Sequence, residues 1–75
     1  MVQRLYISLG ASLEDVVTAL LEAKANGEHR YYEYEGHFFL SDTVTMDYAF
    51  QTVYGMTKQE YDLQNNFLLN NKKTI

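Results

Sequence analysis

The sequence predicts an α+β domain with the element order β-α-β-β-α-α, in which helices cover one face of a three-stranded, mainly antiparallel sheet. Three observations support this fold class: apolar residues alternate over residues 3–9, recur with helical spacing over residues 13–25, and flank a Glu-Gly pair in two aromatic-rich runs. The chain has 75 residues, no proline and no Gly/Ser-rich linker, so we expect one domain, residues 1–75.

The first expected element is a strand over residues 3–9. Leu5, Ile7 and Leu9 lie on one side of it, and polar or aromatic residues occupy the intervening positions. A period of two is typical of a half-buried strand. Gly10 ends the pattern.

A helix is expected from Leu13 to Ala25. Ser12 is a suitable N-cap, and Asp15 lies three residues later in the capping-box position. Gly27 follows the last turn, where glycine commonly ends a helix. The apolar stripe consists of Leu13, Val16, Val17, Leu20 and Leu21, with Ala23 and Ala25.

A β-hairpin is expected next, with strands over residues 30–34 and 37–41 joined by a two-residue turn at Glu35-Gly36. This turn places Tyr34 opposite His37, Glu33 opposite Phe38, Tyr32 opposite Phe39 and Tyr31 opposite Leu40. One face then carries Arg30, Tyr32, Tyr34, His37 and Phe39, and the other carries His29, Tyr31, Glu33, Phe38 and Leu40. Only one face can lie on the helix, so we expect Tyr32 and Tyr34 in the core and the apolar residues of the second face in need of another partner.

Two further helices are expected in the C-terminal third. Met46, Ala49, Phe50 and Val53 recur with helical spacing, and Gly55 ends the run. Thr57 and Glu60 form a second capping-box pattern, with Met56 and Tyr61 placed for a hydrophobic staple. We expect this last helix to run from Lys58 to about Asn70.

Composition excludes several classes of protein. The chain has no cysteine, so disulfides and thiolate metal sites are ruled out. A net charge of −4 disfavours direct nucleic-acid binding, and Lys72-Lys73 are the only adjacent basic residues. No apolar run approaches the roughly 20 residues of a transmembrane helix. We therefore expect a cytoplasmic protein with no membrane association; its small core leaves self-association, including a homodimer, open.

Catalysis is not expected. His29 and His37 lie on opposite faces of the expected hairpin, so they cannot share one site. The hydroxyl and carboxylate groups of residues 41–45 are interpreted as helix caps: Ser41, Asp42, Thr43 and Thr45. The chain contains no phosphate-binding loop and none of the common hydrolase or metalloprotease motifs. We accordingly expect no catalytic residue, no metal and no cofactor.

The segment from Gly36 to Phe50, with its Gly-His turn followed by Ser-Asp-Thr-Val-Thr, resembles small, functionally unassigned proteins of phages and prophages of Gram-positive bacteria. The later Gly55-Met56-Thr57-Lys58 and Tyr61 belong to the same pattern, which covers about two thirds of the chain. Where those proteins tend to have Asn-Gly at the turn and a polar residue after the histidine, this chain has Glu35-Gly36 and Phe38. The resemblance brings no catalytic residues.

The resemblance implies a phage protein that binds and inhibits a host protein, such as a defence nuclease, in the manner of an anti-CRISPR or other anti-defence protein. On this hypothesis carboxylates around the hairpin, Glu28 among them, pair with a basic surface while aromatic residues anchor the contact. The expected interface consists of Tyr31, Glu33, Glu35, Phe38, Leu40 and Asp42. Two alternatives stay open: a homo-oligomeric structural or accessory phage protein, and a nucleotide-binding sponge that uses Arg4 and Arg30.

Overall fold

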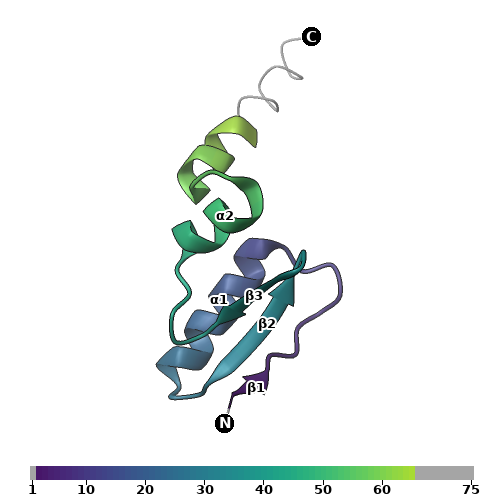
Figure 1. Cartoon of the computed structure of the whole chain (residues 1–75), viewed down its shortest axis with the longest axis vertical. Coiled ribbons are helices and arrows are strands. Elements are labelled where there is room, and N and C mark those ends of the chain that lie inside the picture. Colours follow the sequence, from purple (N-terminus) through teal and green to yellow (C-terminus); the bar gives the residue numbers. More distant parts are fainter. Residues whose placement is uncertain (1, 66–75) are drawn as a thin grey trace.

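The computed structural model describes residues 2–65, which form an α+β fold. The elements are β1 (Gln3–Arg4), α1 (Leu13–Ala25), β2 (Arg30–Tyr34), β3 (His37–Leu40) and α2 (Met46–Tyr54), followed by a C-terminal helix that begins at residue 58 (Figure 1). The sheet has the order β1-β2-β3. Helix α1 lies across one face of the sheet, and α2 packs against α1 and β3.

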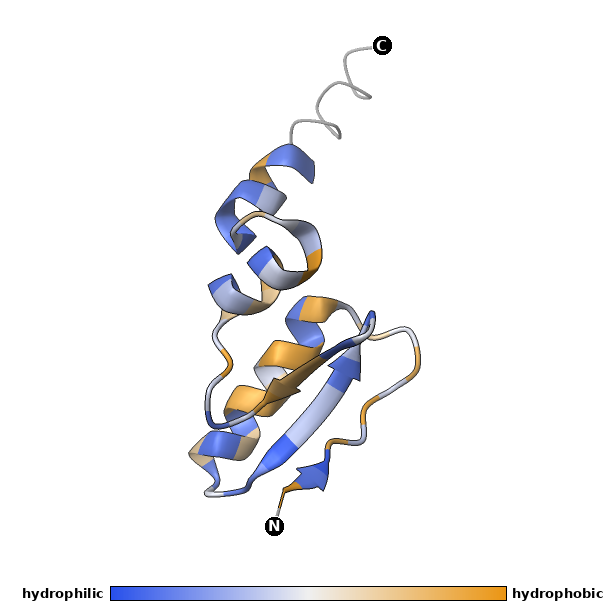
Figure 2. Cartoon of the chain, viewed as in Figure 1, coloured by the Kyte–Doolittle hydropathy of each residue, from blue (hydrophilic) through white to orange (hydrophobic). Residues whose placement is uncertain are grey.

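Helix α1 has the bounds that the sequence predicts. The Ser12 Oγ accepts a hydrogen bond from the Asp15 N–H at 3.2 Å, and the Asp15 carboxylate accepts one from the Ser12 N–H at 3.3 Å, which completes the capping box. The apolar stripe of α1 faces the sheet (Figure 2). Together with residues from β3, α2 and the segment between them it forms the core: Leu13, Val16, Val17, Leu20, Phe39, Val44, Ala49 and Phe50.

The hairpin of β2 and β3 also has the predicted register. Tyr32 is paired with Phe39, and Phe39 is buried against α1, while Tyr32 and Tyr34 contact the edge of the core. Both turn residues have positive φ, 51° at Glu35 and 78° at Gly36. Positive φ at both central positions is the geometry of a type I′ turn, whose twist matches that of the strands. Tyr32 and Tyr34, which were expected in the core, lie on the predicted face but are only partly buried and pack against the core.

The N-terminal strand differs from the expectation in length and direction. β1 spans only Gln3–Arg4 and pairs with β2 in parallel, whereas β2 and β3 are antiparallel, so the sheet is mixed and the antiparallel prediction holds for the hairpin alone. The last hydrogen bond of this segment to β2 runs from the Leu5 N–H to the Tyr31 carbonyl. The chain then leaves the sheet and leads to the start of α1 at Leu13. Ile7 still contacts the core, but Leu9 is completely exposed, so its expected burial is wrong.

The last two helices begin as expected. The Thr45 Oγ1 accepts a hydrogen bond from the Tyr48 N–H and caps α2, and Gly55 ends α2 in the left-handed conformation. The Thr57–Glu60 capping box is present, so the predicted start of the C-terminal helix at residue 58 is confirmed. The expected end near Asn70 lies outside the described residues. No helix within residues 2–65 has the length and apolar character needed to cross a bilayer.

An aromatic cluster joins α2 to the C-terminal helix. The ring of Tyr61 stacks on Tyr54 with a centroid separation of 4.6 Å and meets Phe50 edge-on at 5.3 Å. Hydrogen bonding with the neighbouring Tyr34 hydroxyl, followed by burial, raises the pKa of the Tyr54 phenol above its ordinary value of 10.0. Tyr54 thus links α2 to the C-terminal helix, and Tyr34 of the hairpin packs against the same core.

Candidate interaction surface on the hairpin

One face of the hairpin points away from α1, and its residues form pairs that lie opposite each other on neighbouring strands. We call it the outer face, and it comprises His29, Tyr31, Glu33, Phe38, Leu40 and Asp42. The register pairs Tyr31 with Leu40 and Glu33 with Phe38. Side chains alternate across a strand, so these residues lie opposite the buried Phe39. No described helix lies on this face (Figure 1).

The middle of the outer face is apolar and exposed. The rings of Tyr31 and Phe38 lie diagonally across the two strands, with centroids 6.1 Å apart and a tilt of 42°. The Phe38 side chain is 65% exposed and Leu40 is 43% exposed, whereas Phe39 between them is 1% exposed. The described part of the C-terminal helix packs on α2 through Tyr61 and leaves Phe38 uncovered. Within the described residues Phe38 and Leu40 are therefore exposed, while Tyr31 between them and β1 is partly buried.

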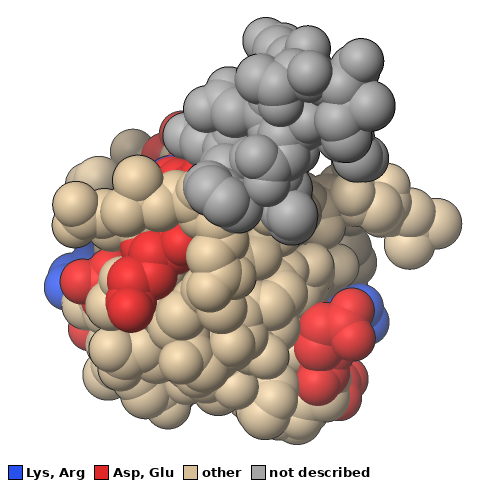
Figure 3. Space-filling view, turned by 90° about the horizontal axis from the view of Figure 1, so that it is seen from above, with Lys and Arg blue, Asp and Glu red and all other residues tan. Residues whose placement is uncertain are grey.

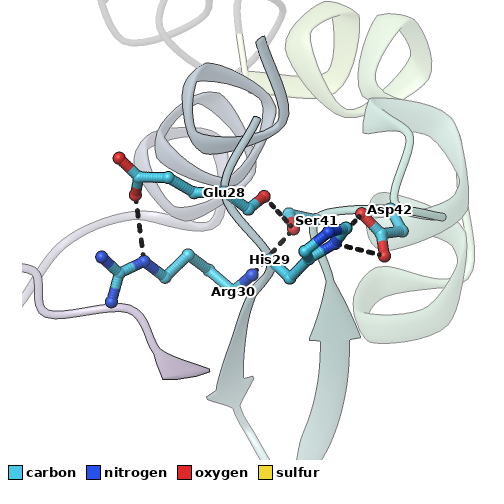
Figure 4. Close-up of polar contacts among 5 residues, drawn as sticks. All are labelled: Glu28, His29, Arg30, Ser41 and Asp42. Atoms are coloured by element: carbon cyan, nitrogen blue, oxygen red, sulfur yellow. Dashed lines mark hydrogen bonds and ion pairs between the residues drawn. The ribbon is translucent and has the colours of Figure 1, made fainter. Parts of the chain in front are cut away.

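One end of the outer face is closed by a His–Asp pair. The His29 Nδ1 lies 3.0 Å from each carboxylate oxygen of Asp42, and both side chains are at least half exposed (Figure 4). Two hydrogen bonds continue the hairpin pairing past the end of β3: the Ser41 N–H donates to the Arg30 carbonyl at 2.8 Å, and the Arg30 N–H donates to the Ser41 Oγ at 2.9 Å. The His29–Asp42 contact was not predicted, although extending the register two rows beyond Tyr31–Leu40 places these residues opposite each other.

Of Ser41, Asp42, Thr43 and Thr45, which were interpreted as helix caps, the structure shows this role for Thr45 alone. Thr45 provides the side-chain cap of α2. Ser41 is buried, and its Oγ accepts from Arg30 and donates to the Glu28 carbonyl at 3.4 Å (Figure 4). Both functions of this hydroxyl are occupied by the backbone, so Ser41 is not arranged as a nucleophile. Asp42 contacts His29 and no helix terminus.

The carboxylates around the hairpin fall into two groups. Glu28 pairs with the Nε of Arg30 at 3.1 Å, and Asp42 contacts His29, so these two already have partners within the protein. Glu33 and Glu35 make no ion pair among the described residues. In the view of Figure 3 the acidic side chains form separate groups divided by uncharged surface. The carboxylates that remain available to a partner are therefore those near the turn.

The arginines proposed for a nucleotide sponge do not form a cationic pocket. Arg30 pairs with Glu28 and donates from Nη1 to the Arg4 carbonyl at 3.4 Å, while the Arg4 guanidinium lies 5.9 Å from the centre of the Tyr32 ring. A hollow of about 70 Å³ lies elsewhere, between α1, α2 and the C-terminal helix. Its lining includes the carboxylates of Glu14 and Asp62, which would repel a phosphate.

Lys58 ties the C-terminal helix to α1 beside this hollow. Its Nζ lies 2.6 Å from the Asp62 carboxylate and 3.7 Å from that of Glu14. The hydrogen bond to Asp62 raises the pKa of Lys58 above its ordinary value. Within residues 2–65 no three His, Asp or Glu side chains are grouped in a way that could hold a metal ion. The outer face of the hairpin is the better candidate for a functional site.

A comparison with protein-family models, curated proteins and solved structures finds no match for this chain.

Proposed function

We propose that this protein acts by binding a basic surface of another protein through the outer face of its hairpin. The observation that supports this function is the juxtaposition of Phe38, 65% exposed, with Glu33 directly opposite it in the register. Glu33 and Glu35 have no cationic partner among the described residues. An exposed aromatic residue beside unpaired carboxylates suits a partner that offers both an apolar pocket and Lys or Arg side chains.

The two kinds of residue have different roles in this proposal. Phe38, with Tyr31 against it and Leu40 beside it, supplies the apolar anchor, because buried aromatic side chains contribute most of the binding free energy at interfaces. The carboxylates at the turn accelerate association and select a basic partner, because charge complementarity acts mainly on specificity and on-rate. Catalysis plays no part in this function.

The turn itself supports a role for its carboxylate. Glu35 is held at a φ of 51°, in the left-handed region that favours Gly and Asn over Glu. Asparagine would form the same type I′ turn with less strain. A residue that is unfavourable for folding at an exposed position suggests selection for another property, here the negative charge.

The resemblance to phage and prophage proteins suggests the class of partner. We propose a host defence nuclease, in the host cytoplasm, whose basic nucleic-acid channel is occupied by the carboxylates and aromatic residues of the outer face. The chain would then act as an inhibitor of the anti-CRISPR or anti-defence type. Such a partner normally binds polyanionic phosphates, so it presents the clustered Lys and Arg that Glu33 and Glu35 require.

The test has two steps. The tagged protein, its Phe38→Ala variant and a Leu63→Ala control are used to capture partners from a Gram-positive host lysate; Leu63 is also exposed but lies on the C-terminal helix. We expect one nucleic-acid-binding protein to be captured by the wild type and the control, and to be lost with Phe38→Ala. Increasing amounts of the wild-type chain should then displace nucleic acid from the captured protein.

Charge is tested separately. The double variant Glu33→Gln, Glu35→Gln should bind the captured protein at least tenfold more weakly, and wild-type binding should weaken with salt. Removing the same charge elsewhere, by Glu22→Gln with Asp47→Asn, should have little effect. Binding that ignores both salt and the turn carboxylates would reject a basic partner. A homo-oligomer that buries Phe38 between copies, detected by light scattering over a range of concentrations, would replace the proposal.

A further inference from the structure

The strand that carries Phe38 and Leu40 lies at the edge of the sheet. The sheet order is β1-β2-β3, so within the described residues β3 is paired with β2 on one side only. Edge strands present backbone N–H and C=O groups to any extended segment that can align with them. The side chains and the backbone of β3 therefore have to be considered together.

The hydrogen-bond pattern identifies which backbone groups point outward. The Ser41 N–H donates to the Arg30 carbonyl, so residues 30 and 41 form a hydrogen-bonded pair. Such pairs alternate along an antiparallel ladder. His37 and Phe39 therefore direct their backbone groups toward β2, and Phe38 and Leu40 direct theirs away from it. The residues with exposed apolar side chains are also those with outward-facing backbone groups.

Only a few backbone groups of β3 point outward without a hydrogen-bond partner. The Leu40 carbonyl already accepts hydrogen bonds from the N–H groups of Thr43 and Val44, at 3.2 and 2.9 Å. The Phe38 N–H, the Phe38 carbonyl and the Leu40 N–H make no hydrogen bond within the described part of the chain. A partner strand can thus form about three backbone hydrogen bonds, and the turn that follows Leu40 limits its length.

We infer that the partner of the outer face supplies an extended basic segment, which pairs with β3 as a fourth strand of the sheet. This inference rests on the proposed function and specifies how the partner is bound. Backbone pairing would give affinity, while side chains on the outer side of the added strand would contact Phe38 and Leu40. Lysine or arginine in the segment would reach the carboxylates of Glu33 and Glu35, which have no ion pair among residues 2–65.

The charge of the chain favours this occupant over a second copy. Pairing two β3 edges would bring together two chains of net charge −4 and would add no cation near Glu33 or Glu35. An extended basic segment neutralises these carboxylates and uses the same backbone groups. The partner chemistry is therefore a strand that combines apolar residues with Lys or Arg.

The test uses a defined probe, the acetylated and amidated peptide Thr-Lys-Thr-Val-Thr-Lys-Thr (the Lys-Val peptide), titrated into ¹⁵N-labelled protein; its Lys and Val side chains share one face of the strand, as contact with both Phe38 and Glu33 requires. We expect slower hydrogen exchange at the Phe38 and Leu40 amides, and much weaker binding of the Glu-Val analogue. Two further peptides carry N-methyl groups on alternate amides. Because one edge of a strand faces β3, one N-methylated peptide should bind at least about tenfold more weakly and the other should bind like the parent.

The outcomes separate this inference from the proposed function. If both N-methylated peptides bind like the parent while Phe38→Ala still weakens binding, the outer face binds without strand addition and the inference is overturned. Absence of binding by the Lys-Val peptide at millimolar concentration also overturns it, whereas the proposed function is judged by capture of a partner from the lysate. Slowed exchange at Phe38 and Leu40 that depends on protein concentration alone would identify a second copy as the occupant.

Discussion

The Nδ1 of His29 lies 3.0 Å from both carboxylate oxygens of Asp42, thirteen residues away, and this pair lies two rows beyond the last register pair of β2 and β3. In the adjoining row the Ser41 side chain is buried, and its hydroxyl accepts a hydrogen bond from the Arg30 N–H and donates one to the Glu28 carbonyl. The end of the hairpin is thus held by polar contacts, while its middle presents apolar side chains. This arrangement leads to predictions about stability as well as binding.

Removing the Ser41 hydroxyl should destabilise the protein. Ser41→Ala leaves the Arg30 N–H without its acceptor at a partly buried position, which costs about 1–3 kcal/mol of unfolding free energy. Urea denaturation followed by circular dichroism measures this change. Ser8→Ala, at an exposed position in the loop before α1, is the control and should change stability by less than about 0.5 kcal/mol. Equal effects of both substitutions would contradict the assigned role of Ser41.

Replacing the strained turn residue should stabilise the fold. Glu35→Asn keeps the type I′ turn and relieves the cost of a left-handed Glu, so the unfolding free energy should rise by about 0.5–1 kcal/mol. Gly36→Ala should have the opposite effect. The added Cβ would meet no neighbouring atom, but alanine is strained at the Gly36 φ of 78°. Thermal and urea unfolding of both variants provide the measurement. A destabilised Glu35→Asn would show that the glutamate contributes to folding.

Adjacent phenylalanines of β3 should differ strongly in their effect on stability. Phe39→Ala removes a ring that is 1% exposed and should cost about 3–5 kcal/mol. Phe38→Ala removes an exposed ring whose aromatic neighbour is Tyr31, and should cost no more than about 1 kcal/mol. Urea unfolding of the two variants tests the assignment of the two faces. A large loss with Phe38→Ala would mean that the outer face is covered in solution.

The Tyr54 phenol should make the protein less stable at high pH. Its pKa is raised in the folded state, so this contribution is fully present below the ordinary value of 10.0 and is lost as the pH rises above it. Between pH 10 and 11.5, the unfolding free energy of the wild type should fall more steeply than that of Tyr54→Phe. The slopes of unfolding free energy against pH should differ by nearly 1.4 kcal/mol per pH unit, which corresponds to about one proton released on unfolding. Parallel curves for the two proteins would contradict the raised pKa.

The local elements could be read directly from neighbouring residues. Ser12 with Asp15 set the start of α1, and the Glu35-Gly36 pair set the turn and with it the register of the hairpin. These capping boxes and the two-residue turn depend on atoms within three or four positions of each other, so the local sequence predicted them. The division of the hairpin into a core face and an outer face followed from the same register.

Contacts between distant segments required the tertiary structure. Three features could not be seen in neighbouring residues: the parallel pairing of Gln3–Arg4 with β2, the exposure of Leu9, and the burial of Ser41 next to the His29–Asp42 contact. An alternating pattern predicts which side of a strand is apolar. It does not predict over how many residues a second strand stays within hydrogen-bonding distance. The sequence therefore determined that the hairpin has an apolar outer face. The tertiary structure decided that α1 covers the opposite face, and that the edge of β3 remains without a partner strand within residues 2–65.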